Sequence, residues 1–193
     1  MQKWVAAILI FSLLSCHNNY NNPHVLISTF YGDIELELYP GKAPKTVSAF
    51  LSYIDSGFYK NSSFYRVLKA EEQPPASIRS DLIQGGMWQT NYKRAEKIPG
   101  ITHESTKQTG LLHLDGTISL ARTDIGTAST EFFICIGNQP EYDFGGKANP
   151  DGQGFAAFGK VIKGMDVVRR IHELPDTDGS FDTKADIYDV KKL

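Results

Sequence analysis

Cysteine is scarce in this sequence, and only Cys16 and Cys135 occur among its 193 residues. A framework of several disulfides, of the kind that holds small secreted domains together, is therefore excluded. The five histidines show no spacing typical of a metal site. An excess of positive charge is also missing, because 20 Lys and Arg stand against 22 Asp and Glu. We therefore expect no nucleic-acid partner, since binding phosphates needs a concentrated basic surface.

A long apolar run is missing at the N-terminus. The mainly apolar segment Trp4–Leu14 is shorter than the roughly 20 residues that a membrane-spanning helix needs. It follows Lys3 and fits the hydrophobic region of a signal peptide. Leu13–Cys16 then resembles a bacterial lipobox, in which the cysteine carries the lipid. The alternative is an ordinary signal peptide in which this cysteine is incidental.

These features divide the chain into three parts. We expect residues 1–15 to be a signal peptide, residues 16–23 to be a lipidated cysteine with a polar tether, and residues 24–193 to form the folded domain. The protein is then exported and held by an N-terminal lipid anchor on the periplasmic side of a membrane. We favour the outer membrane, because His17 is not the Asp associated with inner-membrane retention. The remaining cysteine, Cys135, lies in an apolar run that predicts a buried thiol without a catalytic role.

The first part of the domain has the pattern of a hairpin followed by a helix. Apolar and acidic residues alternate before Tyr39, which is typical of a half-buried strand, and Gly32-Asp33 is the expected turn of a hairpin that starts at Val25. Pro44 fits the first turn of a helix that ends near Gly57. Four apolar residues of this helix share one face: Val47, Phe50, Leu51 and Ile54.

The rest of the domain consists of short apolar runs between turns, which favours an all-β barrel or sandwich. The expected strands are Phe64–Leu68, Asp81–Met87, Thr117–Ala121, Phe132–Ile136 and Phe155–Val161. A second helix is expected from about Met165, and Ile187–Val190 is expected to return as a closing strand. Two surface loops stand out, Lys69–Ser80 and Gly145–Gly154.

The most specific signals are five short segments: Phe64–Val67, Ile83–Gly86, Gly116–Thr123, Ser129–Cys135 and Phe155–Val161. In this order they resemble the cyclophilins, the peptidyl-prolyl cis/trans isomerases. The resemblance extends from about Val25 to the C-terminus. It implies a mainly β fold, a closed eight-stranded barrel capped by two α-helices, and it implies rotation about X–Pro peptide bonds as the activity.

Rotation about an X–Pro bond is slow because amide resonance is lost at the twisted state, which raises a barrier of roughly 18–20 kcal/mol. A catalyst needs no metal, cofactor or nucleophile. It needs an apolar pocket for the proline ring and a donor aimed at the prolyl nitrogen. The resemblance implies that Arg66 is this donor, that Gln84 orients it or the substrate, and that Phe133 is the floor of the pocket. The other implied substrate-binding residues are Leu82, Ala121, Arg122, Glu131, Tyr142 and Phe155.

Three positions depart from the family pattern. Asp81 stands where cyclophilins usually have a pocket phenylalanine, although Ile78 could take that place because the loop before it is longer than usual. Glu141 stands where the family has Trp or Phe, and Tyr142 beside it could supply the aromatic wall. Glu131 replaces the usual Gln, and its carboxylate could either orient the catalytic arginine or compete for its hydrogen bonds.

These departures leave two functions open. The first is a prolyl isomerase that assists the folding of exported proteins, with proline-containing peptides and unfolded exported chains as its partners. The second is a proline-peptide-binding module or holdase with weak or lost catalysis. The two differ in whether Asp81 lines the pocket. A structural surface lipoprotein is a third possibility, which would require an occluded groove. A monomer is the expected state in each case.

Overall fold

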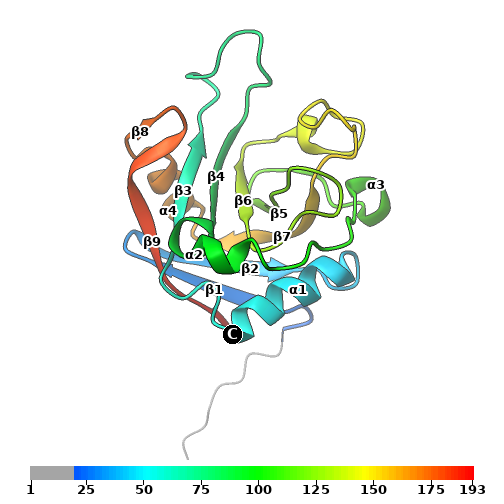
Figure 1. Cartoon of the computed structure of the whole chain (residues 1–193), viewed down its shortest axis with the longest axis vertical. Helices are drawn as coiled ribbons and strands as arrows, with labels where there is room; N and C mark the ends of the chain where they lie inside the picture. The colour runs from blue at the N-terminus through cyan, green and yellow to red at the C-terminus, as the bar shows by residue number, and fades with distance from the viewer. Residues whose placement is uncertain (1–19) are drawn as a thin grey trace, which may run out of the picture.

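The computed structural model describes residues 20–193, so the expected signal peptide and Cys16 lie outside the described part of the chain. Its strands form one antiparallel sheet (Figure 1). The strands are β1 (His24–Thr29), β2 (Gly32–Leu38), β3 (Ser62–Leu68), β4 (Asp81–Gly86), β5 (Thr117–Leu120), β6 (Phe132–Ile136), β7 (Ala156–Lys163), β8 (Asp176–Thr177) and β9 (Ser180–Lys192). The helices are α1 (Pro44–Asp55), α2 (Trp88–Ala95), α3 (Thr106–Thr109), α4 (Met165–His172) and the 3-10 turn η1 (Pro140–Tyr142).

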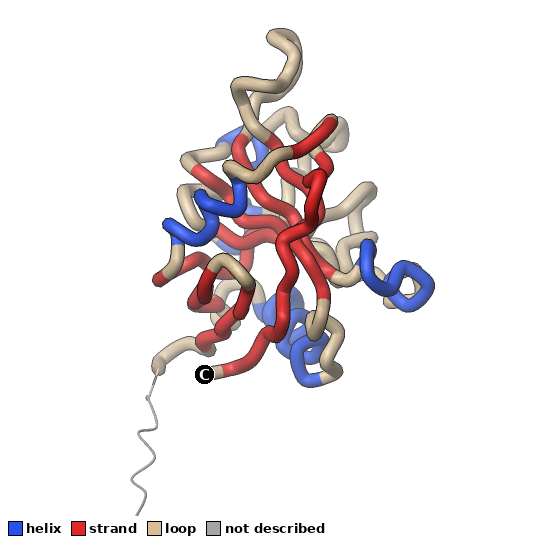
Figure 2. The backbone as a smooth tube through the Cα atoms, turned by 90° about the vertical axis from the view of Figure 1, so that its left-hand side faces the viewer, coloured by secondary structure: helices blue, strands red, loops and turns tan. Residues whose placement is uncertain are grey.

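The sheet closes on itself. Eight strands follow one another in the order β1-β2-β7-β5-β6-β4-β3-β9, and β9 also pairs with β1, where Ile27 lies opposite Val190. The two-residue strand β8 pairs with β9 alone and adds a short hairpin to the rim. The expected closed eight-stranded barrel is therefore confirmed. Figure 2 shows the strands wrapping around the interior, with the C-terminus beside the start of the described chain, where Leu193 N–H donates to His24 O over 3.0 Å.

The predicted hairpin is present, but its predicted turn is wrong. The turn residues are Phe30 and Tyr31, and Gly32 is already the first residue of β2. Gly32 has a φ of +129°, and a Cβ there would lie 2.9 Å from Val167 Cγ2 of α4. The glycine is therefore needed for the close approach of a helix, and this need cannot be distinguished from a turn signal in the sequence.

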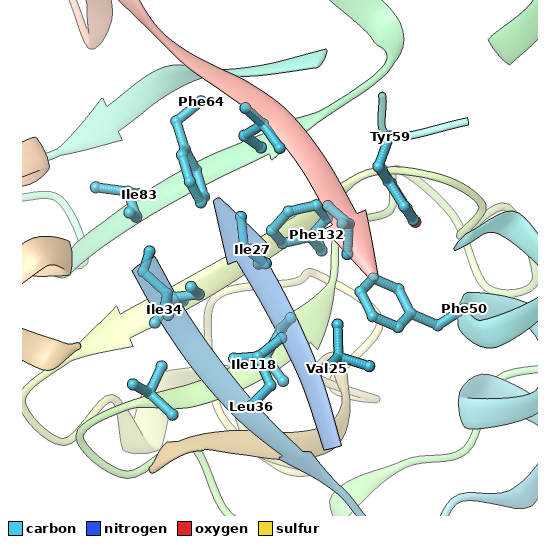
Figure 3. Close-up of a cluster of buried hydrophobic side chains, with 14 of the residues drawn as sticks. Val25, Ile27, Ile34, Leu36, Phe50, Tyr59, Phe64, Ile83, Ile118 and Phe132 are labelled. Carbon is cyan, nitrogen blue, oxygen red and sulfur yellow. The ribbon is translucent and has the colours of Figure 1, made fainter. Parts of the chain in front are cut away.

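The core fills the interior of the barrel. Phe50 of α1 packs its ring against Tyr59 and Phe132, with centroids 5.2 and 5.8 Å apart (Figure 3). Its ring also lies 5.0 Å from that of Phe158, measured between centroids. Val168 and Ile171 place one face of α4 in the same cluster. Burying each such side chain stabilises the fold by about 1.5–3 kcal/mol. The two predicted helices are confirmed, whereas α2 and α3 lie where no helix was expected.

Strand alternation then separates the core from an outer face. Val67, Ile83 and Ile134 point into the core, so their neighbours in sequence point outward. Arg66 of β3 pairs with Gln84 of β4, and Gln84 pairs with Phe133 of β6. These three residues therefore form one row across three strands on the outside of the barrel.

A β-bulge modifies this row. The pairing of β3 with β4 and β9 shifts between Phe64 and Arg66, so Tyr65 has no direct partner in either ladder. An extra residue of this kind re-aims a side chain that regular alternation would place on the opposite face. Tyr65 and Arg66 consequently reach the same groove although they are adjacent in sequence.

The long loop between β3 and β4 rises at the end of the barrel opposite the C-terminus (Figure 1). Its last residue, Ser80, is buried, and its hydroxyl lies 2.8 Å from the hydroxyl of Tyr142. This contact joins the loop to the segment before β7. None of the helices between residues 20 and 193 is both long and apolar enough to span a membrane.

Candidate active site

The outer face of β3, β4 and β6 lines a groove with a volume of about 610 Å³. All nine residues expected to act on the substrate line it: Arg66, Leu82, Gln84, Ala121, Arg122, Glu131, Phe133, Tyr142 and Phe155. Tyr65, Leu68 and Trp88 also line it and were not anticipated. The groove is open, so the occluded surface required by a purely structural lipoprotein is not observed.

One side of the groove is a chain of hydrogen bonds, which we call the relay. The exposed guanidinium of Arg66 donates from Nη1 to Gln84 Oε1 over 3.2 Å. Gln84 Nε2 donates to the hydroxyl of Tyr65 over 3.0 Å. Tyr65 donates in turn to Glu131 Oε2 over 2.7 Å. Glu131 and Arg66 form no ion pair within residues 20–193, so they are connected only through the two residues between them.

Glu131 occupies a space that only a glycine leaves open. A Cβ at Gly86, where φ is +147°, would lie 2.5 Å from either carboxylate oxygen. The backbone N–H of Trp88 and the hydroxyl of Thr130 each donate to Glu131 Oε1 over 3.0 Å. Burial raises the pKa of Glu131 above its ordinary value, although these donors act against the rise. Burial and the neighbouring carboxylate also raise the pKa of Tyr65.

The opposite side of the groove is apolar. Leu82, Phe133 and Tyr142 are almost fully buried and form a cluster separate from the barrel core, with Phe155 packed against it. The Phe133 ring lies 5.5 Å from Tyr142 and 5.2 Å from Phe155, measured between ring centroids. Cys135 lies in the same cluster, where burial raises the pKa of its thiol. The predicted buried cysteine is therefore confirmed.

A buried histidine, His113, packs against the apolar side of the groove. The ring of His113 stacks on Phe133 with 5.9 Å between centroids. Its Nδ1 lies 2.7 Å from Asp143 Oδ1 and its Nε2 lies 3.0 Å from the hydroxyl of Ser119. This Ser-His-Asp arrangement resembles a hydrolytic triad, but Ser119 has no exposed surface and cannot meet a substrate. Its effect is to hold the Phe133 ring and the segment that bears Tyr142. No pattern in the sequence indicates this role for His113.

Arg122 lines the groove, but its guanidinium is already occupied. It makes a bidentate contact with Asp151, at 2.7 and 2.9 Å, and donates to Gly154 O. The contact lowers the pKa of Asp151 to about 2. The Arg122 side chain therefore braces the loop that precedes Phe155.

The remaining departures from the family pattern lie outside the groove. Asp81 Oδ1 accepts a hydrogen bond from Ala70 N–H over 2.8 Å and faces His172 at 3.5 Å. Whether Asp81 or Ile78 takes the place of the usual pocket phenylalanine was open from the sequence, and neither of them lines the groove. Asp81 instead closes the base of the loop. Glu141 accepts from Lys147 N–H, while Tyr142 lines the groove. Among residues 20–193, no cluster of His, Cys, Asp and Glu could hold a metal ion.

Comparison with known proteins identifies the family. The family model described as cyclophilin type peptidyl-prolyl cis-trans isomerase/CLD matches residues 24–192. A peptidyl-prolyl cis-trans isomerase of Acinetobacter baylyi is 38% identical, over 91% of this chain and 85% of its own length. Peptidyl-prolyl cis-trans isomerase B of Escherichia coli is 34% identical, over 76% of this chain and 82% of its own length.

Solved structures show the same fold. A cyclophilin type peptidyl-prolyl cis-trans isomerase of Cryptosporidium parvum superimposes with a TM-score of 0.70 at 23% identity, over 89% of this chain and 98% of its own. A second crystal structure of that protein, determined in the presence of the dipeptide Ala-Pro, gives a TM-score of 0.67. The chain therefore belongs to the cyclophilin family and is a peptidyl-prolyl cis-trans isomerase.

Proposed function

We propose that Arg66 is the catalytic donor of this isomerase and that the apolar side of the groove holds the proline ring of a peptide from an exported protein. The observation that carries the proposal is the row formed by Arg66, Gln84 and Phe133. It sets an exposed guanidinium beside a buried aromatic cluster, with one side chain between them.

The chemistry needs only these parts. As the C–N bond twists, the prolyl nitrogen loses conjugation and becomes a hydrogen-bond acceptor. A guanidinium is a fixed, charged donor, and Gln84 Oε1 limits the positions that the Arg66 side chain can take. A donor that is already oriented stabilises the twisted state without reorganisation, and each 1.4 kcal/mol of stabilisation increases the rate by about tenfold.

The alternative of a binding module with weak or lost catalysis differs from the catalytic one in whether Asp81 lines the pocket. Asp81 is engaged with Ala70 outside the groove, which supports the catalytic alternative. Proline-containing peptides are the proposed ligands, because the cluster of Phe133, Tyr142 and Phe155 offers an apolar surface of aromatic rings.

Export and lipidation are the second part of the proposal. They are supported by the lipobox-like Leu13–Cys16, which lies outside the described residues. Labelling cells with an alkyne analogue of palmitate tests it: the wild-type chain should take up label and sediment with membranes, and Cys16→Ala should do neither. An unlabelled, freely soluble wild-type chain would contradict it.

The catalytic proposal is tested by exchange NMR on an Ala-Pro-Phe-type peptide with residues 20–193, which contain the complete barrel. We expect wild type to accelerate cis/trans exchange and Arg66→Ala to reduce that acceleration by about 100-fold, the effect of removing one preorganised donor. Arg79→Ala is the matched control, since Arg79 is an exposed arginine that does not line the groove. A wild-type chain that binds the peptide without accelerating exchange would overturn the assignment.

A further inference from the structure

The relay contains one group that can only accept hydrogen bonds, and this fixes the direction of all the others. An ionised carboxylate has no hydrogen to give, so Tyr65 must donate its single hydroxyl hydrogen to Glu131. The Tyr65 oxygen can then only accept from Gln84, which places the Nε2 end of that amide next to it. The Oε1 end is left facing the guanidinium of Arg66.

Without this constraint the Gln84 amide has two orientations of nearly equal shape. If Tyr65 instead donated to Gln84, the Oε1 end would turn toward Tyr65 and the Nε2 end would face Arg66. Two donors would then oppose each other, and the hydrogen bond of 3.2 Å that holds the guanidinium would be lost. The orientation of the arginine therefore depends on a group two residues farther along the relay.

The position of Glu131 suits this task. Its carboxylate receives three donors, from Tyr65, Trp88 N–H and Thr130, and it fits only because residue 86 is a glycine. We propose that Glu131 is a positioning residue that fixes the direction of the relay, so that Gln84 always presents an oxygen to Arg66. This inference rests on the proposed role of Arg66 as the catalytic donor.

The charge of Glu131 should then control activity. The titratable and charged groups around it are the hydroxyls of Tyr59 and Tyr65 and the guanidinium of Arg66. Burial raises the pKa of both tyrosines, so neither ionises when the medium is acidified. Burial also raises the pKa of Glu131, so this carboxylate gains a proton before an ordinary glutamate does. Once protonated, it can donate to Tyr65 and the direction of the relay is no longer fixed.

The test compares Glu131→Gln with wild type by exchange NMR over a range of pH. Gln keeps the size of the side chain but can donate as well as accept. We expect kcat/KM of the variant at neutral pH to fall by about tenfold, the order of one hydrogen bond to a charged group. Wild-type activity should fall on acidification toward the level of Glu131→Gln, whose own profile should be flat.

Glu104→Gln is the matched control. Glu104 is also a buried carboxylate that accepts backbone hydrogen bonds, from Lys45 and Thr46 at the start of α1, but it does not line the groove. The Glu104→Gln variant should leave both the activity and the pH dependence of the activity unchanged. Glu131→Gln should not lower the melting temperature, because burial disfavours the charged form of this side chain. A loss of stability that accompanies the loss of activity would indicate a merely structural role.

Tyr65→Phe supplies the decisive comparison. It removes the hydroxyl through which Glu131 reaches Gln84, so adding Glu131→Gln to Tyr65→Phe should cause no further loss of activity. Losses that multiply, or a Glu131→Gln variant as active as wild type at every pH, would overturn the proposal.

A readout that does not depend on catalysis separates this proposal from the previous one. The ¹⁵N and ¹H shifts of the Gln84 side-chain amide should follow one titration in wild type and lose it in Glu131→Gln. If the Gln84 shifts titrate but the wild-type chain does not accelerate exchange, the proposed role of Arg66 is refuted and the relay is supported. An active wild type without the titration would refute the relay alone.

Discussion

The two sides of the groove are built differently, although they share the same strands. On the relay side, Arg66 is exposed, and single hydrogen bonds in series connect it through Gln84 and Tyr65 to Glu131. On the apolar side, Phe133 is 2% exposed and Tyr142 is 8% exposed, and each ring is held by several others. A change on the relay side should therefore cost rate with little stability, whereas a change on the apolar side should cost both.

The bracing of the two sides explains this difference further. Behind the apolar side, the carboxylate of Asp143 is hydrogen-bonded to His113, and the carboxylate of Asp151 accepts from Arg122. These two contacts fix the segment that carries Tyr142. On the relay side, the carboxylate that accepts from Tyr65 is Glu131, and it lies within the relay itself. The apolar side is thus held by carboxylates that do not line the groove, Asp143 and Asp151, whereas the hydrogen-bond direction in the relay is set by its own last residue, Glu131.

Phe133→Ala should have the largest effect and breaks the apolar side. Removing a buried phenylalanine destabilises a fold by about 3–5 kcal/mol, because packing is lost and a cavity remains. The Michaelis constant for the peptide should also rise. The buried thiol of Cys135 should be alkylated faster in native buffer, since the cluster that covers it opens more often.

Arg66→Ala is the control for this experiment, because it should leave both the melting temperature and the rate of Cys135 alkylation at wild-type values. Equal alkylation in the two variants would show that the two sides open together, which would remove the distinction between them.

Asp151→Asn should have a smaller effect and tests the bracing of the apolar side. Since Arg122 lowers the pKa of Asp151 from 3.8 to about 2, this contact contributes above pH 3.8 and is lost as the pH falls through about 2. We expect the Gly145 amide, which donates to Gly152 O, to exchange roughly threefold faster in the variant at neutral pH. Asp124→Asn, on another exposed loop, is the control. Unchanged exchange would mean that the contact between Arg122 and Asp151 does not brace this loop.

Tyr142→Phe should have the smallest effect and sharpens the comparison. It keeps the ring on the apolar side and removes only the contact with Ser80, which should cost about 0.5 kcal/mol. Peptide binding should stay the same, while trypsin should cleave faster in the Lys69–Ser80 loop because its last residue is released. Tyr92→Phe, an exposed tyrosine on α2, is the control. A clear loss of peptide affinity would show that the Tyr142 hydroxyl contacts the substrate.

Much of the fold and of the groove could be predicted from sequence, because it follows from short periodic patterns. The spacing of Val47, Phe50 and Ile54 predicts the buried face of α1, and all three residues are buried. The co-location of Arg66, Gln84 and Phe133 came from the family resemblance, and the strand register supplies its physical reason.

What could not be predicted depends on local exceptions to those patterns. Alternation places Tyr65 opposite Arg66, and only the bulge brings both to the groove, so the relay was missed. The sequence leaves the place of Asp81 open, because its partner, Ala70, lies across a long loop whose path no short pattern describes. Gly32 was assigned to a turn because the requirement of α4 for a residue without a side chain is a tertiary contact.

The closing strand also determines when this protein can become functional. β9 pairs with β1 near the start of the domain and with β3 beside the groove, and Ala185, Ile187 and Val190 on it belong to the core. Until it is in place, β1 and β3 present open edges that can pair with other chains. Because the contact joins segments far apart in sequence, barrel closure is expected to be a late and slow event. This isomerase must therefore wait for the last strand of its own domain to be synthesised, and it is most in need of protection just before then.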